Sequence, residues 1–123
     1  MKKGSESRRM NVGIDVIEIK RFREKPLNKE NASFYHSIFT KSELLYCTKY
    51  SDPYPHIAGI FAAKESVLKC LVRPIKMIEI EISHNRGGKP SLAIHSRKKR
   101  AVQARISITH TQSIAVAVAV TSL

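Results

Sequence analysis

The sequence lacks several features that would mark whole classes of protein. It has no tryptophan, only two cysteines, and no apolar run near the roughly 20 residues that a membrane-spanning helix needs. Acidic residues are scarce: 10 Asp and Glu stand against 22 Lys and Arg, which gives a formal net charge of +12. We therefore expect an anionic partner, and nucleic acid, a phosphorylated cofactor and an acidic protein all meet that description.

Common catalytic motifs are missing as well. There is no Walker-type phosphate loop, and Gly87-Gly-Lys-Pro90 lacks the spacing of a dinucleotide-binding fingerprint. No G-x-S-x-G elbow indicates a serine hydrolase, and no Cys–His spacing indicates a zinc site. We expect Cys47 and Cys70 to be free thiols in a reducing compartment, with a disulfide as the less favoured alternative.

The length and composition predict one folded domain. A chain of 123 residues with 42% hydrophobic content can bury a core of moderate size. Residues 1–10 are charged and lack the apolar stretch of a signal peptide, so we expect a flexible basic tail, a domain over residues 11–123, and a cytoplasmic location. The basic run 97–100 fits either a phosphate-binding patch or a solvated loop between strands.

Hydrophobic periodicity predicts an α+β fold in which an antiparallel sheet packs against a long central helix. Thr40 and Glu43 have the spacing of a helix-starting capping box. The last strand alternates valine with alanine, and its small alanine face should let a helix approach closely. The predicted helices are 20–25, 28–37, 40–50 and 56–71, and the predicted strands are 11–19, 77–83, 91–95, 105–109 and 113–121.

Two acidic residues are candidates for a site. Asp15 shares a strand face with isoleucines, so it either reaches water at a sheet edge or has a partner. Glu65 lies four residues before Lys69 on the central helix, where the two form either a solvated pair or part of a site. Two carboxylates completed by substrate phosphates are a common way to hold Mg²⁺, and a nearby lysine can neutralise phosphate charge. Spacing alone does not choose between these alternatives.

Five motifs together resemble the holo-acyl-carrier-protein synthase family, the short 4′-phosphopantetheinyl transferases. They occur in the family's order and extend over nearly the whole chain, from Val12 to Val120. The motifs are Gly13-Ile-Asp-Val-Ile-Glu-Ile-Lys-Arg-Phe22, Phe39-Thr-Lys-Ser-Glu-Leu44, Phe61-Ala-Ala-Lys-Glu-Ser66 with Lys69, Gly88-Lys-Pro90 and Ile106-Ser-Ile-Thr-His-Thr111.

The resemblance implies transfer of the 4′-phosphopantetheine arm of coenzyme A to a serine of apo acyl carrier protein, with release of 3′,5′-ADP. It implies that Asp15 and Glu65 bind Mg²⁺, that Glu65 and Lys69 are catalytic, and that Lys69 contacts the phosphates. His110 would lie beside coenzyme A, and Lys64 is grouped with the cofactor-binding residues, its exact role left open. The family's small members are trimers with sites between subunits, so a homotrimer is expected.

Two positions depart from the family's pattern. Ile60 stands where an arginine is common, and residues 72–76 replace a glycine-containing loop. Arg73, Lys76 or the run 97–100 would then have to supply the missing phosphate contacts. A coenzyme A-binding protein without turnover is therefore one alternative function. The other is a small basic nucleic-acid-binding domain, which should expose aromatic side chains among its lysines and arginines; we expect contact with neither nucleic acid nor membrane.

Overall fold

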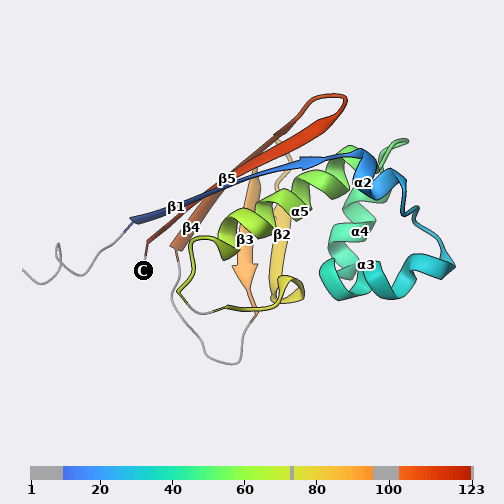
Figure 1. The fold of residues 1–123 in the computed structure, drawn as a ribbon. Coiled ribbons are helices and arrows are strands. Elements are labelled where there is room, and N and C mark those ends of the chain that lie inside the picture. The colour runs from blue at the N-terminus through green and yellow to red at the C-terminus, as the bar shows by residue number, and fades with distance from the viewer. Residues whose placement is uncertain (1–9, 73, 96–102, 123) are drawn as a thin grey trace, which may run out of the picture.

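The first and last strands of the chain lie side by side in a three-stranded antiparallel sheet (Figure 1). The computed structural model describes residues 10–72, 74–95 and 103–122. The central strand is β5 (Ile114–Ser122), flanked by β1 (Met10–Glu18) and β4 (Gln103–His110). All three strands were predicted, with bounds that differ by one or two residues. Met10 belongs to β1 rather than to the expected tail, and residues 1–9 lie outside the described residues.

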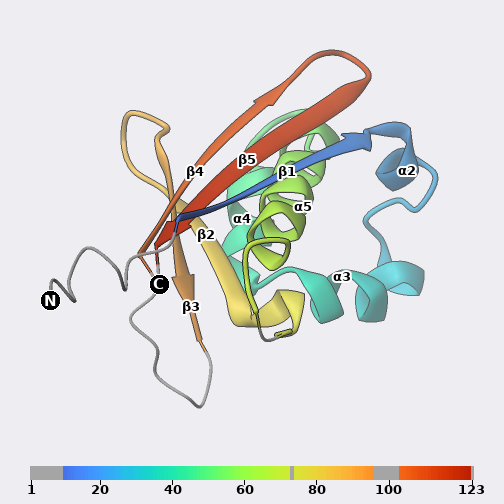
Figure 2. The same cartoon turned by 60° about the vertical axis from the view of Figure 1, so that its left-hand side comes forward.

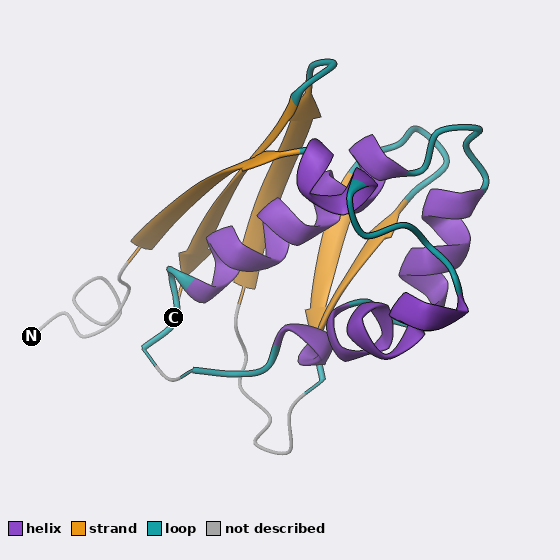
Figure 3. Ribbon diagram, turned by 45° about the vertical axis from the view of Figure 1, so that its right-hand side comes forward, coloured by secondary structure: helices purple, strands orange, loops and turns teal. Residues whose placement is uncertain are grey.

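One long helix, α5 (Tyr54–Leu68), runs along this sheet (Figure 3). It begins two residues before the predicted range 56–71, because Pro55 is tolerated in the first turn, where its missing N–H is not needed. It also ends three residues before the end of that range. Ala115, Ala117 and Ala119 of β5 are buried beneath it. The prediction that the alanine face of the last strand admits a helix is confirmed.

Strand β1 approaches α5 unusually closely at Gly13. A Cβ atom added there would lie 2.0 Å from the carbonyl oxygen of Ser66 and 3.2 Å from Sγ of Cys70. Only hydrogen fits between the two backbones, so this position requires glycine. The contact sets the side of β1 that carries Gly13 and Asp15 against the C-terminal half of α5.

The remaining two strands form a separate hairpin of β2 (Ile80–His84) and β3 (Pro90–Ile94), which lies next to β4 (Figure 2). Its turn places Gly88 at a φ of +85°, a conformation that favours glycine. The predicted hairpin is confirmed. Two details of the prediction are wrong: residues 77–79 form the 3₁₀ helix η2 (Met77–Glu79) instead of a strand, and the strands are divided between two sheets. The N–H of Glu79 bonds to the carbonyl of Lys76 and closes that tight turn.

Short helices pack beside the sheet against α5, β2 and η2. They are α2 (Lys20–Arg23), η1 (Lys29–Asn31), α3 (Ala32–Ile38) and α4 (Lys41–Thr48). The predicted helix at 28–37 begins as η1, which Asn28 caps by accepting a bond from the N–H of Asn31, and continues as α3. The capping box of Thr40 and Glu43 is confirmed. In the described ranges, no helix combines the length and apolar character needed to cross a membrane.

Aromatic rings from four segments meet between these helices and α5, and both cysteines lie in the interior as free thiols. Burial raises the pKa of Cys47 to about 12, so this thiol stays protonated and unreactive at neutral pH. The expectation of two free thiols is confirmed. The clustered rings are Phe22, Phe34, Tyr35, Phe39 and Phe61.

The contact between β1 and α5 yields a first prediction. Gly13→Ala should lower the free energy of unfolding by about 1–3 kcal/mol, because the added methyl group forces the two backbones apart. Urea denaturation would measure the loss. Gly87→Ala is the matched control, since its added Cβ would meet only Asn85 Oδ1, at 3.5 Å. Equal stability of Gly13→Ala and wild type would contradict the tight packing described here.

Candidate active site

Asp15 of β1 and Lys69, the C-cap residue of α5, meet although 54 residues separate them in the chain. The Lys69 ammonium donates to the Asp15 Oδ1 atom at 3.2 Å and to the carbonyl oxygen of Ile14 at 2.7 Å. Only 15% of the Asp15 side chain is exposed, against 52% of the Lys69 side chain. Asp15 therefore does not simply reach water at a sheet edge; it faces the helix and has a cationic partner there.

Glu65 lies on α5 one turn before Lys69 and next to Ser66, the residue that Gly13 touches. Its side chain is half-buried, and no hydrogen bond to its carboxylate occurs among the described residues. The contacts of the neighbouring residues place Asp15, Glu65 and Lys69 along one boundary between β1 and α5.

Oxygen donors of this kind suit a hard cation such as Mg²⁺, which is usually held by one or two carboxylates together with substrate phosphates and water. Within the described ranges, no three His, Cys, Asp or Glu side chains gather in a way that could hold a metal ion. The described residues of one chain therefore offer at most a partial set of ligands. Asp15 and Glu65 have the donor chemistry for such an ion, whose remaining ligands would have to come from a bound molecule.

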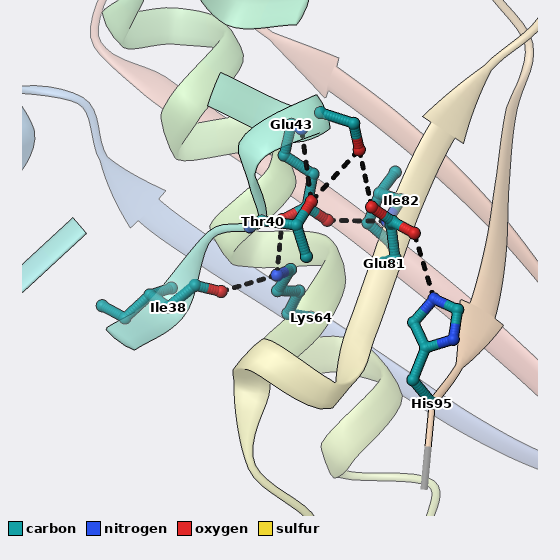
Figure 4. A network of polar contacts seen from close by, with 8 residues as sticks. Ile38, Thr40, Glu43, Lys64, Glu81, Ile82 and His95 are labelled. Carbon is teal, nitrogen blue, oxygen red and sulfur yellow. Dashed lines mark hydrogen bonds and ion pairs between the residues drawn. The ribbon is translucent and has the colours of Figure 1, made fainter. Parts of the chain in front are cut away.

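Lys64 does not lie on the boundary with β1, although it immediately precedes Glu65. Its side chain is fully buried, and its ammonium donates to Glu43 Oε1 at 2.7 Å and to the carbonyl of Ile38 at 2.6 Å (Figure 4). The expectation that Lys64 binds the cofactor is thus contradicted: successive residues of a helix point about 100° apart, and this one points into the core.

His110, at the end of β4, lies near the start of α5 rather than near Glu65. Its ring meets that of His56 at a centroid distance of 5.5 Å. His56 and Glu65 are nine residues apart on α5, which corresponds to about 13 Å along the helix axis. His110 also lines a cavity of about 530 Å³, together with Arg23, Asp52, Pro55, Thr111 and Gln112. A single chain thus places His110 apart from the Asp15–Lys69 contact.

Sequence reasoning missed a cluster of rings around His56. Tyr50 stacks on His56 with a centroid separation of 3.6 Å, and Tyr46 stacks on His84 at 3.9 Å. These residues come from α4, the turn after it, α5 and β2, so no local spacing in the sequence pointed to them. Burial, aided by the nearby His110 and His84, lowers the pKa of His56 below its ordinary value.

The lowered pKa of His56 predicts how stability depends on pH. The unfolded chain binds the His56 proton at a higher pH than the folded chain, so the free energy of unfolding should fall as the pH drops below about 6.5. His56→Phe keeps a flat ring beside Tyr50 but cannot titrate, so its decline between about pH 7 and pH 5 should be shallower. Urea denaturation at stepped pH measures this slope, with His36→Gln, at an exposed position of α3, as control. Identical slopes for His56→Phe and wild type would contradict the prediction.

Comparison with known proteins places the chain in a family. The model of the 4′-phosphopantetheinyl transferase superfamily matches residues 11–119. A holo-[acyl-carrier-protein] synthase of Caldanaerobacter subterraneus is 36% identical over 118 residues, covering 89% of this chain and 91% of that protein. Another, of Leptospira biflexa, is 38% identical over 121 residues, covering 90% and 94%.

Solved structures give the same picture. The holo-[acyl-carrier-protein] synthase of Helicobacter pylori in complex with coenzyme A has a TM-score of 0.77 and 29% identity, covering 89% of this chain and 98% of that one. The Bacillus anthracis enzyme, in complex with CoA (3′,5′-ADP), has a TM-score of 0.76 and 26% identity, covering 91% and 95%. With these matches over nearly its full length, the chain belongs to the 4′-phosphopantetheinyl transferase superfamily and, within it, to the holo-[acyl-carrier-protein] synthase family.

Proposed function

We propose that this protein transfers the 4′-phosphopantetheine arm of coenzyme A to a serine of apo acyl carrier protein and depends on Mg²⁺. The observation that carries the proposal is the contact of Asp15 with Lys69, one helical turn from Glu65, at the boundary between β1 and α5, which is called the seam below. Relatives with the name of this enzyme support it, as do similar structures in complex with coenzyme A. The net charge of +12 suits both a polyanionic cofactor and an acidic carrier protein.

In this reaction the serine oxygen attacks the phosphorus that carries the pantetheine arm. The bond from that phosphorus to the oxygen of 3′,5′-ADP breaks, and 3′,5′-ADP leaves with the electron pair. Asp15 and Glu65 would hold Mg²⁺, which when bound neutralises charge on the diphosphate. Glu65 accepts the serine proton or orients a water that does. Lys69 is half-exposed, so its ammonium can exchange Asp15 for a phosphate oxygen.

Two structural observations bear on the alternatives. Phe22, Phe39 and Phe61 are core residues, and the 42% exposed Tyr50 already stacks on His56, which disfavours the nucleic-acid-binding alternative. Ile60, at the position where related enzymes commonly carry arginine, is buried in the core. Of the residues proposed to compensate, Lys76 is exposed, whereas Arg73 and the run 97–100 lie outside the described residues.

The proposed activity has a direct test. Incubation with coenzyme A, Mg²⁺ and an apo acyl carrier protein should increase the carrier's mass by one phosphopantetheine group. Asp15→Ala and Glu65→Ala should each abolish the gain, because each removes a proposed metal ligand. The control is Glu30→Ala, which removes an exposed carboxylate from η1 far from the seam in the sequence. Full activity of either seam variant would contradict the metal assignment, and inactive wild type would contradict the proposed function.

We further propose that three copies assemble through the outer face of the three-stranded sheet. On β1 this face presents Val12, Ile14 and Val16, which are 67%, 57% and 56% exposed. Directly opposite them in register on β5 lie the partly exposed Val120, Val118 and Val116. A contiguous apolar surface of this kind is typical of a protein interface. Asp15 points from the opposite face of β1 toward α5, but β1 is an edge strand, so a neighbouring copy that extends past this edge would adjoin the boundary between β1 and α5 and bring its own His110 there.

The remaining roles follow from this function. An enzyme that activates acyl carrier protein acts where fatty acids are made, so we propose a place in lipid metabolism in the cytoplasm.

Assembly with shared sites predicts complementation between two inactive variants. Asp15→Ala and His110→Ala should each be inactive or strongly impaired alone, yet regain part of the wild-type rate when coexpressed. Mixed assemblies would contain some sites with an intact Asp15 from one copy and an intact His110 from the next. Sedimentation should give three times the 13.9 kDa chain mass for wild type. Ile14→Asp should reduce this mass and prevent complementation; no regained activity in proven mixed assemblies would place both residues in one chain's site.

A further inference from the structure

Lys64 and Glu43 form an ion pair in which neither side chain is exposed to solvent. The Lys64 ammonium donates to Glu43 Oε1 and to the carbonyl of Ile38 (Figure 4). Glu43 Oε1 also accepts from the N–H of Thr40 at 2.8 Å, and Oε2 accepts from the N–H of Ile82 at 2.7 Å. The pair therefore joins α5 to the end of α3, to the start of α4 and to β2.

A pair buried this deeply does not persist for its Coulomb attraction alone. Removing two charges from water costs several kcal/mol per ion, and replacing such a pair by neutral groups is often neutral or stabilising. Burial accordingly lowers the pKa of Lys64, although Glu43 opposes this effect. What the pair supplies is a fixed orientation of α5 relative to α3, α4 and β2. Each of its four hydrogen bonds is directional, whereas an apolar contact would leave the orientation adjustable.

Because Lys64 precedes Glu65 on α5, fixing the Lys64 side chain also constrains the direction of the Glu65 side chain. Lys64 and Glu65 are adjacent on α5, so the Lys64–Glu43 pair holds one side of the helix while the Glu65 side chain leaves from another side. Opposite this pair, Gly13 of β1 rests on Ser66. Lys64 and Ser66, on either side of Glu65 in the sequence, thus hold the helix between α4 and β2 on one side and β1 on the other. A rotation of α5 by about 10° would move the Glu65 carboxylate by roughly 1 Å.

We infer that Lys64 and Glu43 are positioning residues that set the rotation of α5 and thereby aim the Glu65 carboxylate at the seam with β1. The inference rests on the proposed function, in which Glu65 holds Mg²⁺ and accepts the serine proton or orients a water that does. Groups that orient metal ligands without touching the metal typically affect metal affinity or activity 10–100-fold when lost. Neither Lys64 nor Glu43 touches the substrate in this role.

The test separates positioning from stability. Either single substitution leaves a buried charge without its partner and should destabilise the fold strongly. The double variant Lys64→Met with Glu43→Gln has no such charge and keeps one amide acceptor, so its melting temperature should exceed that of either single variant. Its kcat should nevertheless fall about 10–100-fold, with Mg²⁺ affinity, measured by calorimetry in the presence of coenzyme A, weakened to a similar degree. The KM for coenzyme A should change less than about threefold.

Glu81→Gln is the matched control. Glu81 accepts from Ser42 at 2.6 Å and pairs with His95 at 3.0 Å at the exposed edge of the same network, so its loss should leave kcat and Mg²⁺ affinity unchanged. If the double variant does not fold, Lys64→Arg, which keeps the charge but changes the donor geometry, should show the same losses.

A folded double variant with wild-type kcat and Mg²⁺ affinity would overturn the inference, as would an equal loss in Glu81→Gln. Inactive wild-type protein in the same assay would instead contradict the proposed function, so the two failures are distinguishable.

Discussion

The direct contact between the backbones of β1 and α5 is the constraint on which the rest of the structure depends. At Gly13 nothing larger than hydrogen separates the strand from the carbonyl of Ser66. The alanines of β5 extend the same close packing across the sheet. Because strand and helix lie this near, an aspartate and a lysine separated by 54 residues can form an ion pair. Larger residues at these positions would move the two elements apart and open the seam.

Two lysines of α5 illustrate how position on a helix determines what a charge can do. Lys64 points into the core, where it is fully desolvated and every hydrogen bond it makes is with protein. Lys69, little more than one turn later, is half-exposed and bonded to Asp15 and to a backbone carbonyl. Lys64 has no alternative partner unless the protein unfolds, so its role is to fix the orientation of α5. Lys69 can exchange partners at little cost, since solvent screens its charge.

The sheet uses its two faces differently. One face is filled by α5, whereas the other carries the apolar side chains of β1 and β5 into solvent. His110, at the end of β4, lies near the start of α5 and apart from the acids near its end. This exposed apolar face is the surface that the proposed assembly would cover.

The sequence by itself determined what depends on neighbouring residues. Alternation of apolar residues located β1, β4 and β5, Thr40 and Glu43 marked the start of α4, and the glycines at 87 and 88 marked the hairpin turn, because each signal arises within a few residues. Motif resemblance singled out Asp15, Glu65 and Lys69, together with Lys64 and His110. Only the tertiary structure decided that residues 77–79 turn before the strand begins, that the strands divide into two sheets, and that Lys64 is buried. The partners that decide these features, such as Glu43 for Lys64, come from other elements, and a local pattern reports that a face is buried without naming what covers it.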